Sequence, residues 1–495
     1  MSMSKAVVEF DVAVIGTGQA GPNLAMTLAG RGEKVALIEG GLVGGSCVNH
    51  GCTPTKTLRK SARVAHLMRR AGDFGVQAGE IDIDFAAASA RVAHLVRRAG
   101  DFGVQAGEID IDFDFDFAAA MQRMQQRVDT SRADLEETMA GQHNLTLLRG
   151  WGAFAGQAGD RFELSAGDQP LRAARVFLNT GTRAFIPPLP GIEGVPHLDN
   201  VSLLQLRERP RHLIIIGGSY IGLEMGQIFR RLGSEVTVIE AGPRITGREN
   251  EAVSTALTEM LQAEGLHFHT GHEVERVEKC SDAGVAVMVG GQRVEGSHLL
   301  VATGRSPNTE RLNLAAVGVE TDERGFVPTN GKLETNVPGI WAVGDINKRG
   351  AFTHTSYQDS QIVLANLKGD ARSADGRVSS YAMYTDPPLG RVGLSEAQAR
   401  DSGRATLVAN IQMKDVSRAK EEGETAGLMQ ILVDQQSEQI VGASLLGFGC
   451  DEVIQVISHF MATGARHQVL RDALPIHPTV AEFLPFLLGK LEPLK

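Results

Sequence analysis

The stretch "FDVAVIGTGQAGPNLAMTLAGRGEKVALIEGG", residues 10–41, has the pattern of a strand, a tight turn, a helix and a second strand. Apolar runs predict strands over Phe10–Ile15 and Lys34–Ile38. The turn between them carries the pattern GxGxxG, made by Gly16, Gly18 and Gly21. Glu39 follows the first of these glycines by 23 positions. Glycines that admit a pyrophosphate at a helix N-terminus, followed by an acid that can hold a ribose, predict a dinucleotide site.

The same pattern returns in residues 212–242, "HLIIIGGSYIGLEMGQIFRRLGSEVTVIEAG". Its loop positions are Gly217, Ser219 and Gly222, and Glu240 again lies 23 positions after the first glycine. Ser219 replaces the middle glycine, but serine is small enough to keep a close backbone approach possible. Two such units predict two dinucleotides, or one ancestral fold used twice.

A third stretch, "TNVPGIWAVGDI" at residues 335–346, predicts a strand that ends at Gly344 and Asp345. An acid at the carboxyl end of a strand is suited to a sugar or ribitol hydroxyl. A helix cap is the equally open alternative for the same carboxylate.

The chain has four cysteines, and two of them lie five positions apart in "GGSCVNHGCTPTK", residues 44–56. The second, Cys52, precedes a predicted helix, where the helix dipole favours a thiolate. The pair could be buried thiols, a metal site, a structural disulfide or a redox-active disulfide. Zinc is disfavoured because it takes about four ligands and only His50 is near. Cys280 and Cys450 are expected to be ordinary thiols.

The composition bounds the function. A chain of 495 residues with 42% hydrophobic and 22% charged residues predicts a globular protein of two to four domains. A net charge of −10 gives no reason to expect a nucleic acid or an anionic membrane as partner. No apolar run reaches the length of a membrane span, and no signal peptide is evident, so we expect a cytoplasmic protein.

The cysteine segment resembles the motif GGxCxNxGCxPxK of the flavin-dependent pyridine nucleotide–disulfide oxidoreductases, which include glutathione reductase, dihydrolipoamide dehydrogenase and mercuric reductase. The resemblance extends in order through both fingerprints, "ATGRSPNT", "WAVGD", "YTDPPLGRVGLSE" and "IHPTVAEF". It implies an α/β fold with two Rossmann-like dinucleotide-binding domains, for FAD and NAD(P), and a C-terminal α/β dimerisation domain. It also implies an FAD-dependent enzyme that works as a homodimer with a shared active site.

The resemblance assigns cofactor roles by position. The positions expected to contact FAD are Gly16, Gly18, Gly21, Glu39, Gly152, Asp345 and Thr353. The positions expected to contact the nicotinamide nucleotide are Gly217, Ser219, Gly222, Glu240 and Gly304. Glu240 could accept from both ribose hydroxyls of NADH and would repel the 2′-phosphate of NADPH, so NADH is the expected nucleotide. Arg244 and Arg248 follow closely and keep NADPH open as the alternative.

Catalytic roles follow in the same way. Cys47 would be the thiol that meets substrate, and Cys52 the thiol that faces the flavin. Lys56 and Glu224 match the pair near the reactive edge of the flavin. The last pair, His477 and Glu482, matches a catalytic His–Glu pair that reaches across the dimer interface. A histidine held by a glutamate can move the proton that thiol–disulfide exchange requires.

The expected domains are an FAD-binding domain over 1–186 and 300–368, an NAD(P)-binding domain over 187–299 and a dimerisation domain over 369–495. The first segment also contains a tandem duplication, 61–88 and 89–116, in which residues 61–84 and 89–112 differ at a single position. One copy should continue the Cys52 helix, and the other should be extra chain tolerated at a surface turn. The run "IDIDFDFDF" predicts an added edge strand.

The expected reaction passes electrons from NAD(P)H through FAD to a Cys47–Cys52 disulfide, and then to a small-molecule disulfide or a metal ion, as in mercuric reductase. Two observations weaken Hg(II) as the expected substrate. The resemblance implies that mercuric reductases lack the histidine found here at His477. A soft metal takes several thiolates, and only two are near. Dihydrolipoyl dehydrogenase is the alternative enzyme. A redox-sensing flavoprotein without turnover is the alternative of another class.

Overall fold

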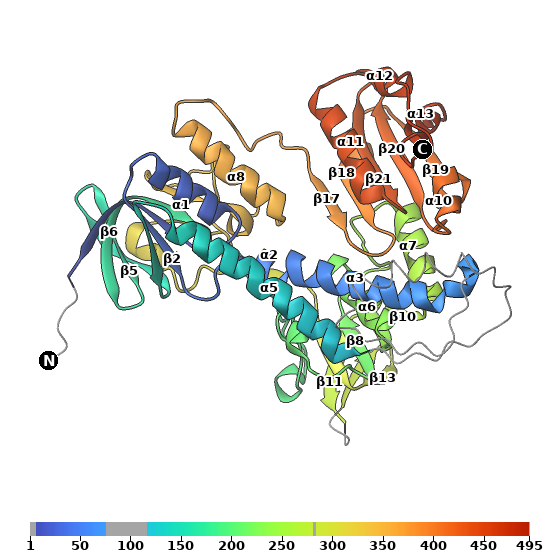
Figure 1. The fold of residues 1–495 in the computed structure, drawn as a ribbon, viewed down its shortest axis with the longest axis horizontal. Coiled ribbons are helices and arrows are strands. Elements are labelled where there is room, and N and C mark those ends of the chain that lie inside the picture. Colours follow the sequence, from blue (N-terminus) through green and yellow to red (C-terminus); the bar gives the residue numbers. More distant parts are fainter. Residues whose placement is uncertain (1–5, 76–115, 281–283, 495) are drawn as a thin grey trace. The chain divides into compact units, whose positions relative to one another are not determined.

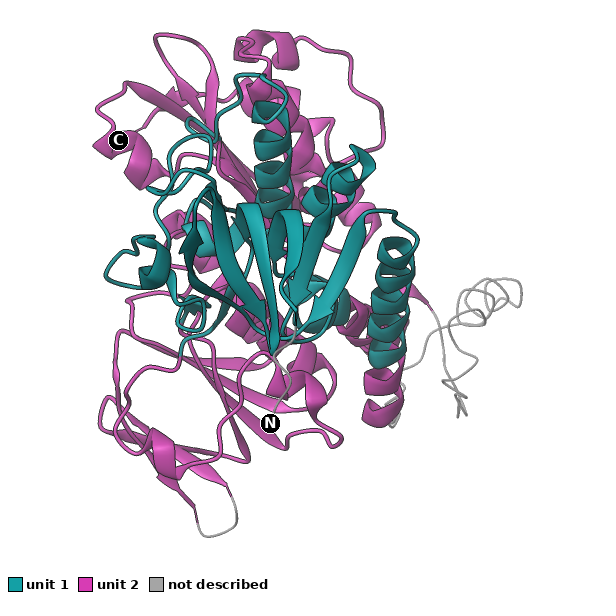
Figure 2. Cartoon of the chain, turned by 90° about the vertical axis from the view of Figure 1, so that its left-hand side faces the viewer, with its two compact units in different colours: residues 1–55, 124–185, 304–377 teal, residues 56–123, 186–303, 378–495 magenta. Residues whose placement is uncertain are grey.

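The computed structural model describes residues 6–75, 116–280 and 284–494, which fall into two compact units (Figures 1 and 2). Unit 1 comprises residues 1–55, 124–185 and 304–377, and unit 2 comprises 56–123, 186–303 and 378–495. Helix α3 (Cys52–Arg69) runs into the first copy of the duplication. The second copy, except for its last residue, and most of the predicted edge strand lie outside the described residues.

Unit 1 is built on a sheet of seven strands (Figure 2). The strands follow the spatial order β3 (Leu145–Arg149), β2 (Val35–Glu39), β1 (Val8–Ile15), β6 (Gln169–Leu178), β5 (Arg161–Ala166) and β4 (Gly152–Ala158), with β16 (Ile340–Ala342) also paired to β6. Strands β1, β2, β3, β6 and β16 pair in parallel, whereas β4, β5 and β6 pair antiparallel. A second, two-stranded sheet joins β7 (Thr182–Ala184) to β15 (Arg305–Pro307).

The first fingerprint forms the predicted strand–helix–strand unit at the centre of this sheet. Helix α1 (Ala20–Gly30) connects β1 to β2 and contacts α8 (Thr353–Asn366), and the two helices lie side by side in Figure 1. Side chains of β1 alternate between two buried clusters, one shared with these helices and one on the opposite face. The carboxyl end of β1 is thereby fixed beside the start of α1.

The third predicted strand is shorter than expected. The sequence predicts a strand over residues 335–346, but only Ile340–Ala342 forms one. Pro338 has no N–H to donate, and the preceding residues turn through hydrogen bonds of Thr335 with Val337 and Ile340. Asp345 still follows directly after this strand, in a short 3₁₀ turn (Gly344–Asn347).

Unit 2 contains the second fingerprint and the C-terminal sheet. Its four-stranded parallel sheet has the order β10 (Leu266–Thr270), β9 (Glu235–Glu240), β8 (His212–Ile216) and β14 (His298–Val301). Helix α6 (Tyr220–Arg231) connects β8 to β9 as predicted. The C-terminal sheet is antiparallel, in the order β17 (Ser380–Met383), β18 (Leu389–Gly393), β21 (Ile440–Leu446), β20 (Leu428–Asp434), β19 (Thr406–Gln412) and β22 (Glu492–Pro493). The expected α/β class is confirmed.

Candidate active site

The loop of the first fingerprint leaves no room for side chains. Gly16 has φ +106°, and a Cβ there would lie 2.3 Å from the Asn179 carbonyl oxygen. A Cβ on Gly21 would lie 2.1 Å from the Gly16 carbonyl oxygen. The Asn179 amide donates to the carbonyl oxygens of Gly16 and Gly18, at 3.0 and 3.1 Å. The loop is therefore fixed with its backbone close to the start of α1, as a pyrophosphate site requires.

Glu39 ends β2 with its carboxylate tied to the same loop. The carboxylate accepts from the backbone N–H of Thr17 at 2.9 Å and from that of Gly41 at 2.7 Å. The Thr17 hydroxyl also donates to it, and in turn accepts from the backbone N–H of Gly44 at 3.1 Å. These bonds fix the carboxylate at the sheet edge where a ribose is expected.

The second fingerprint repeats this geometry in unit 2. Gly217 has φ +114°, and a Cβ there would lie 2.4 Å from the Ala302 carbonyl oxygen. A Cβ on Gly222 would lie 2.0 Å from the Gly217 carbonyl oxygen. Ser219 is the extended N-cap residue of α6, and its side chain forms no cap hydrogen bond. Both loops therefore exclude a Cβ at the first and last glycine for the same reason.

Glu240 occupies the position in unit 2 that Glu39 occupies in unit 1. Its carboxylate accepts from the backbone N–H groups of Gly218 and Gly242, at 2.7 and 2.8 Å. The two acids are thus held in the same way. Each accepts from the backbone N–H of the residue after the first glycine of its loop, and from the backbone N–H two residues after the acid.

The cysteine segment packs directly on the first fingerprint. A Cβ on Gly45 would lie 2.6 Å from the Gly18 Cα, so glycine is required where the segment passes the loop. Cys47 lies in α2 (Gly45–His50) and Cys52 begins α3. Neither cysteine is in a disulfide bond, and Cys52 is close enough to contribute a hydrogen bond to the electrostatics of Cys47. The pair is therefore held beside the proposed pyrophosphate loop.

Thr353 lies against the cysteine pair at the start of α8. Its Oγ1 is 3.2 Å from the Cys52 Sγ. The hydrogen bond with Cys52, together with burial and the Coulombic effect of Cys52, raises the pKa of Cys47, while Thr353 acts in the opposite direction. The second thiol to lose a proton is thus disfavoured beside the first, which is the behaviour of a coupled dithiol.

Asp345 faces Thr182, whose hydroxyl donates to its carboxylate at 2.9 Å. Burial raises the pKa of Asp345, and the Thr182 hydrogen bond and the charge of Arg305 oppose that effect. A Cβ added to Gly152, at the start of β4, would lie 2.7 Å from the Ile15 side chain. Gly304, with φ +156°, belongs to unit 1 and accepts from the backbone N–H of Phe185 at 3.0 Å.

Lys56 and Glu224 form an ion pair in unit 2, with 2.8 Å between Lys56 Nζ and Glu224 Oε2. The other carboxylate oxygen of Glu224 accepts from the backbone N–H of Tyr384 at 2.7 Å. The Lys56 ammonium also lies 4.3 Å from the centre of the Tyr384 ring. The ammonium is therefore held by a carboxylate and an aromatic face.

His477 and Glu482 are in contact in unit 2. His477 Nδ1 lies 2.9 Å from Glu482 Oε2. The His477 side chain is 72% exposed, whereas that of Glu482 is 9% exposed. A nearly buried carboxylate thus orients an imidazole whose other nitrogen is open. The pair belongs to unit 2 and Cys47 to unit 1, so the meeting of His477 with the partner subunit's Cys47 stays a prediction.

The residues present fit bound dinucleotides. Both fingerprint loops keep space that a Cβ would fill. In addition, the buried hydroxyl of Thr180 in unit 1 has no hydrogen-bond partner among the described residues. The same holds for the Thr246 hydroxyl and the Arg244 Nε in unit 2. Thr246 is tied to the second loop, since its backbone N–H donates to the Gly218 carbonyl oxygen at 2.8 Å. Each loop therefore has unsatisfied polar atoms nearby that a nucleotide could satisfy.

Comparison with known proteins decides the family. A model of the pyridine nucleotide-disulphide oxidoreductases matches residues 10–360, and a model of the dimerisation domain of these enzymes matches residues 379–485. The chain belongs to the pyridine nucleotide–disulfide oxidoreductase family. It is therefore an FAD-dependent enzyme with two Rossmann-like domains and a dimerisation domain, as the sequence predicts.

Its relatives in this family differ in activity. The chain is 31% identical to the probable pyridine nucleotide-disulfide oxidoreductase RclA of Escherichia coli, over 96% of this chain and 98% of RclA. It is 30% identical to a mercuric reductase of Streptomyces lividans, over 97% and 96%. It is also 30% identical to a dihydrolipoyl dehydrogenase of Chlamydia muridarum, over 96% and 95%. A solved structure of the HOCl-induced flavoprotein disulfide reductase RclA matches with a TM-score of 0.82, covering 97% of this chain and 99% of that one.

Three other features bear on the chemistry open to the described residues. In these residues no helix has the length and apolarity to cross a membrane. Among the same residues, no three His, Cys, Asp or Glu side chains gather in a way that could hold a metal ion. Cys450 is buried, which raises its pKa.

Two residues of the site were missed from the sequence. Asn179 braces the first loop, and Tyr384 holds the Lys56–Glu224 pair. The signal for Asn179 was its place at the carboxyl end of a strand, where an amide can reach the neighbouring turn. Tyr384 stands in "YTDPPLGRVGLSE", a motif that carries the family resemblance without indicating a role for this tyrosine.

Proposed function

We propose that this enzyme passes two electrons from NADH, through FAD, to a Cys47–Cys52 disulfide, and from the resulting dithiol to a small acceptor. The observation that carries the proposal is the cysteine pair beside the first fingerprint, fixed by the Gly45–Gly18 approach and the Thr353 contact. FAD, when bound, supplies the two-electron relay between the nicotinamide and the cysteines.

The chain's own residues have separable roles in this proposal. Asn179 and Glu39 orient the adenine-nucleotide half of FAD, and Asp345 with Thr182 orients its ribitol. Glu240 orients the ribose of NADH. In each turnover the cysteine disulfide gains two electrons and two protons and becomes the dithiol. With a disulfide acceptor, Cys47 attacks one sulfur, breaks the acceptor's S–S bond and releases the first thiol as a mixed disulfide forms. Cys52 then attacks Cys47 in the mixed disulfide, releases the second thiol and re-forms the Cys47–Cys52 disulfide.

The surface around His477 supports the proposal of a homodimer. Several large apolar side chains of this region are exposed, namely Val469, Leu474, Ile476 and Phe486. Leu474 is 96% exposed and Ile476 is 79% exposed. Apolar side chains so open in a family dimerisation domain are best explained by a second copy of this chain. We propose that this interface brings His477 to the partner subunit's Cys47.

A disulfide acceptor is favoured by one further observation. The His477–Glu482 pair can deliver the proton that a leaving thiolate needs, whereas reduction of a metal ion needs no such proton. The second candidate is a metal ion, as in the mercuric reductase relatives. Solved structures of RclA include a Cu(II) complex, so Cu(II) joins Hg(II) in that class. One turnover would then reduce two equivalents of Cu(II) to Cu(I).

Steady-state reduction tests the proposal. Purified enzyme is given NADH with lipoamide, glutathione disulfide, Hg(II) with excess thiol, or Cu(II), and the oxidation of NADH is followed. We expect many turnovers per flavin with one acceptor, and loss of that turnover in Cys47→Ser. A single two-electron event with every acceptor would instead indicate a redox sensor. Turnover that survives in Cys47→Ser would refute the role of the pair.

We also propose that residues 1–186 and 300–368 bind FAD, that residues 187–299 bind the nicotinamide nucleotide, and that residues 369–495 bind the partner subunit. Limited proteolysis of the holoenzyme should cut first near these limits.

A further inference from the structure

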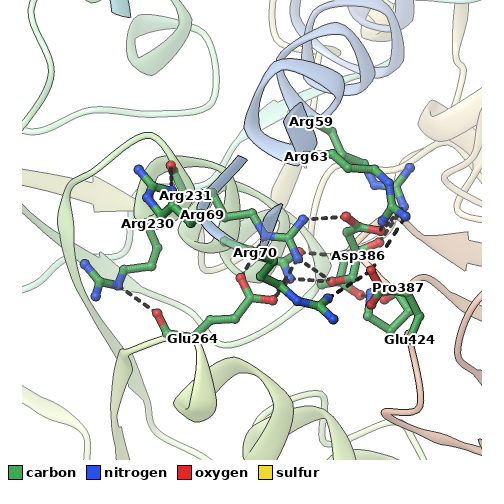
Figure 3. A network of polar contacts seen from close by, with 12 residues as sticks. Arg59, Arg63, Arg69, Arg70, Arg230, Arg231, Glu264, Asp386, Pro387 and Glu424 are labelled. Carbon is green, nitrogen blue, oxygen red and sulfur yellow. Dashed lines mark hydrogen bonds and ion pairs between the residues drawn. The ribbon is translucent and has the colours of Figure 1, made fainter. Parts of the chain in front are cut away.

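Helix α3 carries a row of basic side chains that the proposed reaction does not use. Starting from Lys56, basic residues recur at intervals of three and four along one face of the helix, at Arg59, Arg63 and His66, and Arg70 continues the row directly after the helix ends. The arginines of this row converge on carboxylates of unit 2 (Figure 3). The helix that begins with Cys52 is thus docked along its length by charge pairs.

Asp386 is the centre of this network and is only 3% exposed. Arg63 Nη1 lies 2.5 Å from its Oδ1, and Arg231, from α6, pairs with its Oδ2 (Figure 3). Gln227 binds the Asp386 backbone on both sides, accepting from its N–H at 2.7 Å and donating to its carbonyl oxygen at 2.8 Å. Burial alone would raise the pKa of Asp386, but the Arg63 hydrogen bond and the Arg231 charge lower it to about 2.

Tyr384 lies two residues before this anchor and touches both members of the Lys56–Glu224 pair. Its backbone N–H donates to Glu224, and its ring faces the Lys56 ammonium at 4.3 Å. The Asp386 anchor therefore fixes the backbone that presents Tyr384 to the pair. Lys56 lies four residues after Cys52 on α3, so the two side chains are neighbours on the helix surface.

We propose that Tyr384, held in place by Asp386, is a positioning residue that fixes the Lys56 ammonium one helical turn from Cys52. The inference rests on the proposed function, since it assumes that Cys52 is the thiol that faces the flavin. The fixed ammonium favours the Cys52 thiolate by Coulombic attraction, and the aromatic face adds a cation–π contact that a freely moving lysine would lose.

The test uses the thiolate–flavin charge-transfer absorbance of the holoenzyme at pH 7, in a Cys47→Ser background where no reductant is needed. Tyr384→Leu keeps the backbone N–H and removes the ring, so the absorbance should fall by about half or more. Tyr384→Phe keeps the ring and is the matched control, with absorbance close to that of the parent. If the Tyr384→Leu and Tyr384→Phe variants have the same absorbance, or if Tyr384→Leu leaves the absorbance unchanged, the positioning role is wrong.

A double-mutant cycle separates positioning from general damage. Lys56→Met should lower the absorbance, and adding Tyr384→Leu to it should cause no further loss, because the residue acts through Lys56. An additional loss in the double variant would overturn the inference.

Asp386→Asn tests the anchor, with Glu264→Gln as its control. Glu264 also pairs with Arg231, at 2.7 Å, but it is linked to the Asp386 segment only indirectly, through Arg231 and Gln227, whereas Asp386 lies two residues from Tyr384. Both changes should lower the melting temperature, whereas only Asp386→Asn should lower the absorbance. Equal absorbance loss in both would refute the anchor. If the Cys47→Ser parent binds FAD but shows no charge-transfer absorbance, the proposed role of Cys52 is wrong. That outcome distinguishes a failure of the proposed function from a failure of the positioning role.

Discussion

We propose that this enzyme prefers NADH over NADPH, and Glu240→Ala should remove most of that preference. The Glu240 carboxylate accepts from two backbone N–H groups, of Gly218 and Gly242, at 2.7 and 2.8 Å. It is therefore held at the end of β9 and cannot turn away from a nucleotide in the second fingerprint. Such a fixed carboxylate can accept from the ribose hydroxyls of NADH and faces the 2′-phosphate of NADPH with like charge.

The size of the preference follows from Coulomb's law. Two unit charges 4 Å apart interact by about 4 kcal/mol at an effective dielectric constant of 20, typical of groups near a protein surface. Glu240 is half-buried, so solvent screening reduces this repulsion to about 1–3 kcal/mol. Each 1.4 kcal/mol is a factor of ten, so NADH should be favoured by about tenfold or more in kcat/KM.

Both nearby arginines have other interactions in the structure. Arg244 donates to the Glu249 carbonyl oxygen at 3.2 Å, and the charge of Arg248 acts on Tyr381. Rescue of NADPH would require a rearrangement of one of them toward the phosphate, since an arginine fork binds phosphate well only at contact distance.

The assay is kcat/KM for NADH and NADPH with one common acceptor, in the parent enzyme and in Glu240→Ala. Glu39→Ala is the matched control, because it removes the equivalent acid of the first fingerprint; it should lower FAD occupancy and leave the nucleotide preference of the loaded enzyme unchanged. A parent enzyme that prefers NADPH would refute the reasoning. A preference for NADH that survives Glu240→Ala would show that the cause lies elsewhere.

Three further predictions concern other parts of the site. Two-electron reduction should give a charge-transfer absorbance that Cys52→Ser abolishes and that Cys47→Ser shows without reductant; identical behaviour of the two variants would contradict the assigned roles. Mixing inactive Cys47→Ser and His477→Ala subunits should restore activity, because each hybrid dimer contains one intact site. No recovery of activity under conditions where subunits exchange would show that the site is not shared. Burial, with the charge of Arg231, lowers the pKa of His66 to about 4, below its usual value near 6.5. The unfolded chain therefore binds this proton first, so stability should fall as pH drops from about 6.5 to 4, and His66→Gln should flatten that fall in melting temperature.

Spacing in the sequence predicts the parts of the site whose residues are close in the chain, whereas the Lys56–Glu224 pair, 168 residues apart, is expected only from the family resemblance. Gly16, Gly21 and Glu39 fall within one strand–helix–strand unit, so their spacing alone brings them together. The same is true of His477 and Glu482, which are five residues apart. Local geometry dictates these contacts, because neither depends on where a distant segment of chain comes to lie.

The residues that hold the site in place are far from it in the sequence. Asn179 lies 163 residues from Gly16, and Asp386 lies 323 residues from Arg63. The basic row on α3 is visible as a periodic pattern, but a charged stripe is usually a solvated helix face. Only the tertiary structure shows that its partners, Asp386 and Glu424, come from the C-terminal part of the chain. No spacing rule links segments so far apart.

The buried charges of unit 2 are better explained by position than by stability. Replacing a buried ion pair by apolar side chains of similar size is often neutral or stabilising, so stability alone does not account for Arg231 and Asp386, each with a side chain only 4% exposed. An apolar contact at this place would pack α3 equally well but would tolerate a shift along the helix axis. The directional bonds of Asp386 to Arg63, Arg231 and Gln227 do not tolerate such a shift. A helix that must present one sulfur and one ammonium at fixed places gains from that restriction.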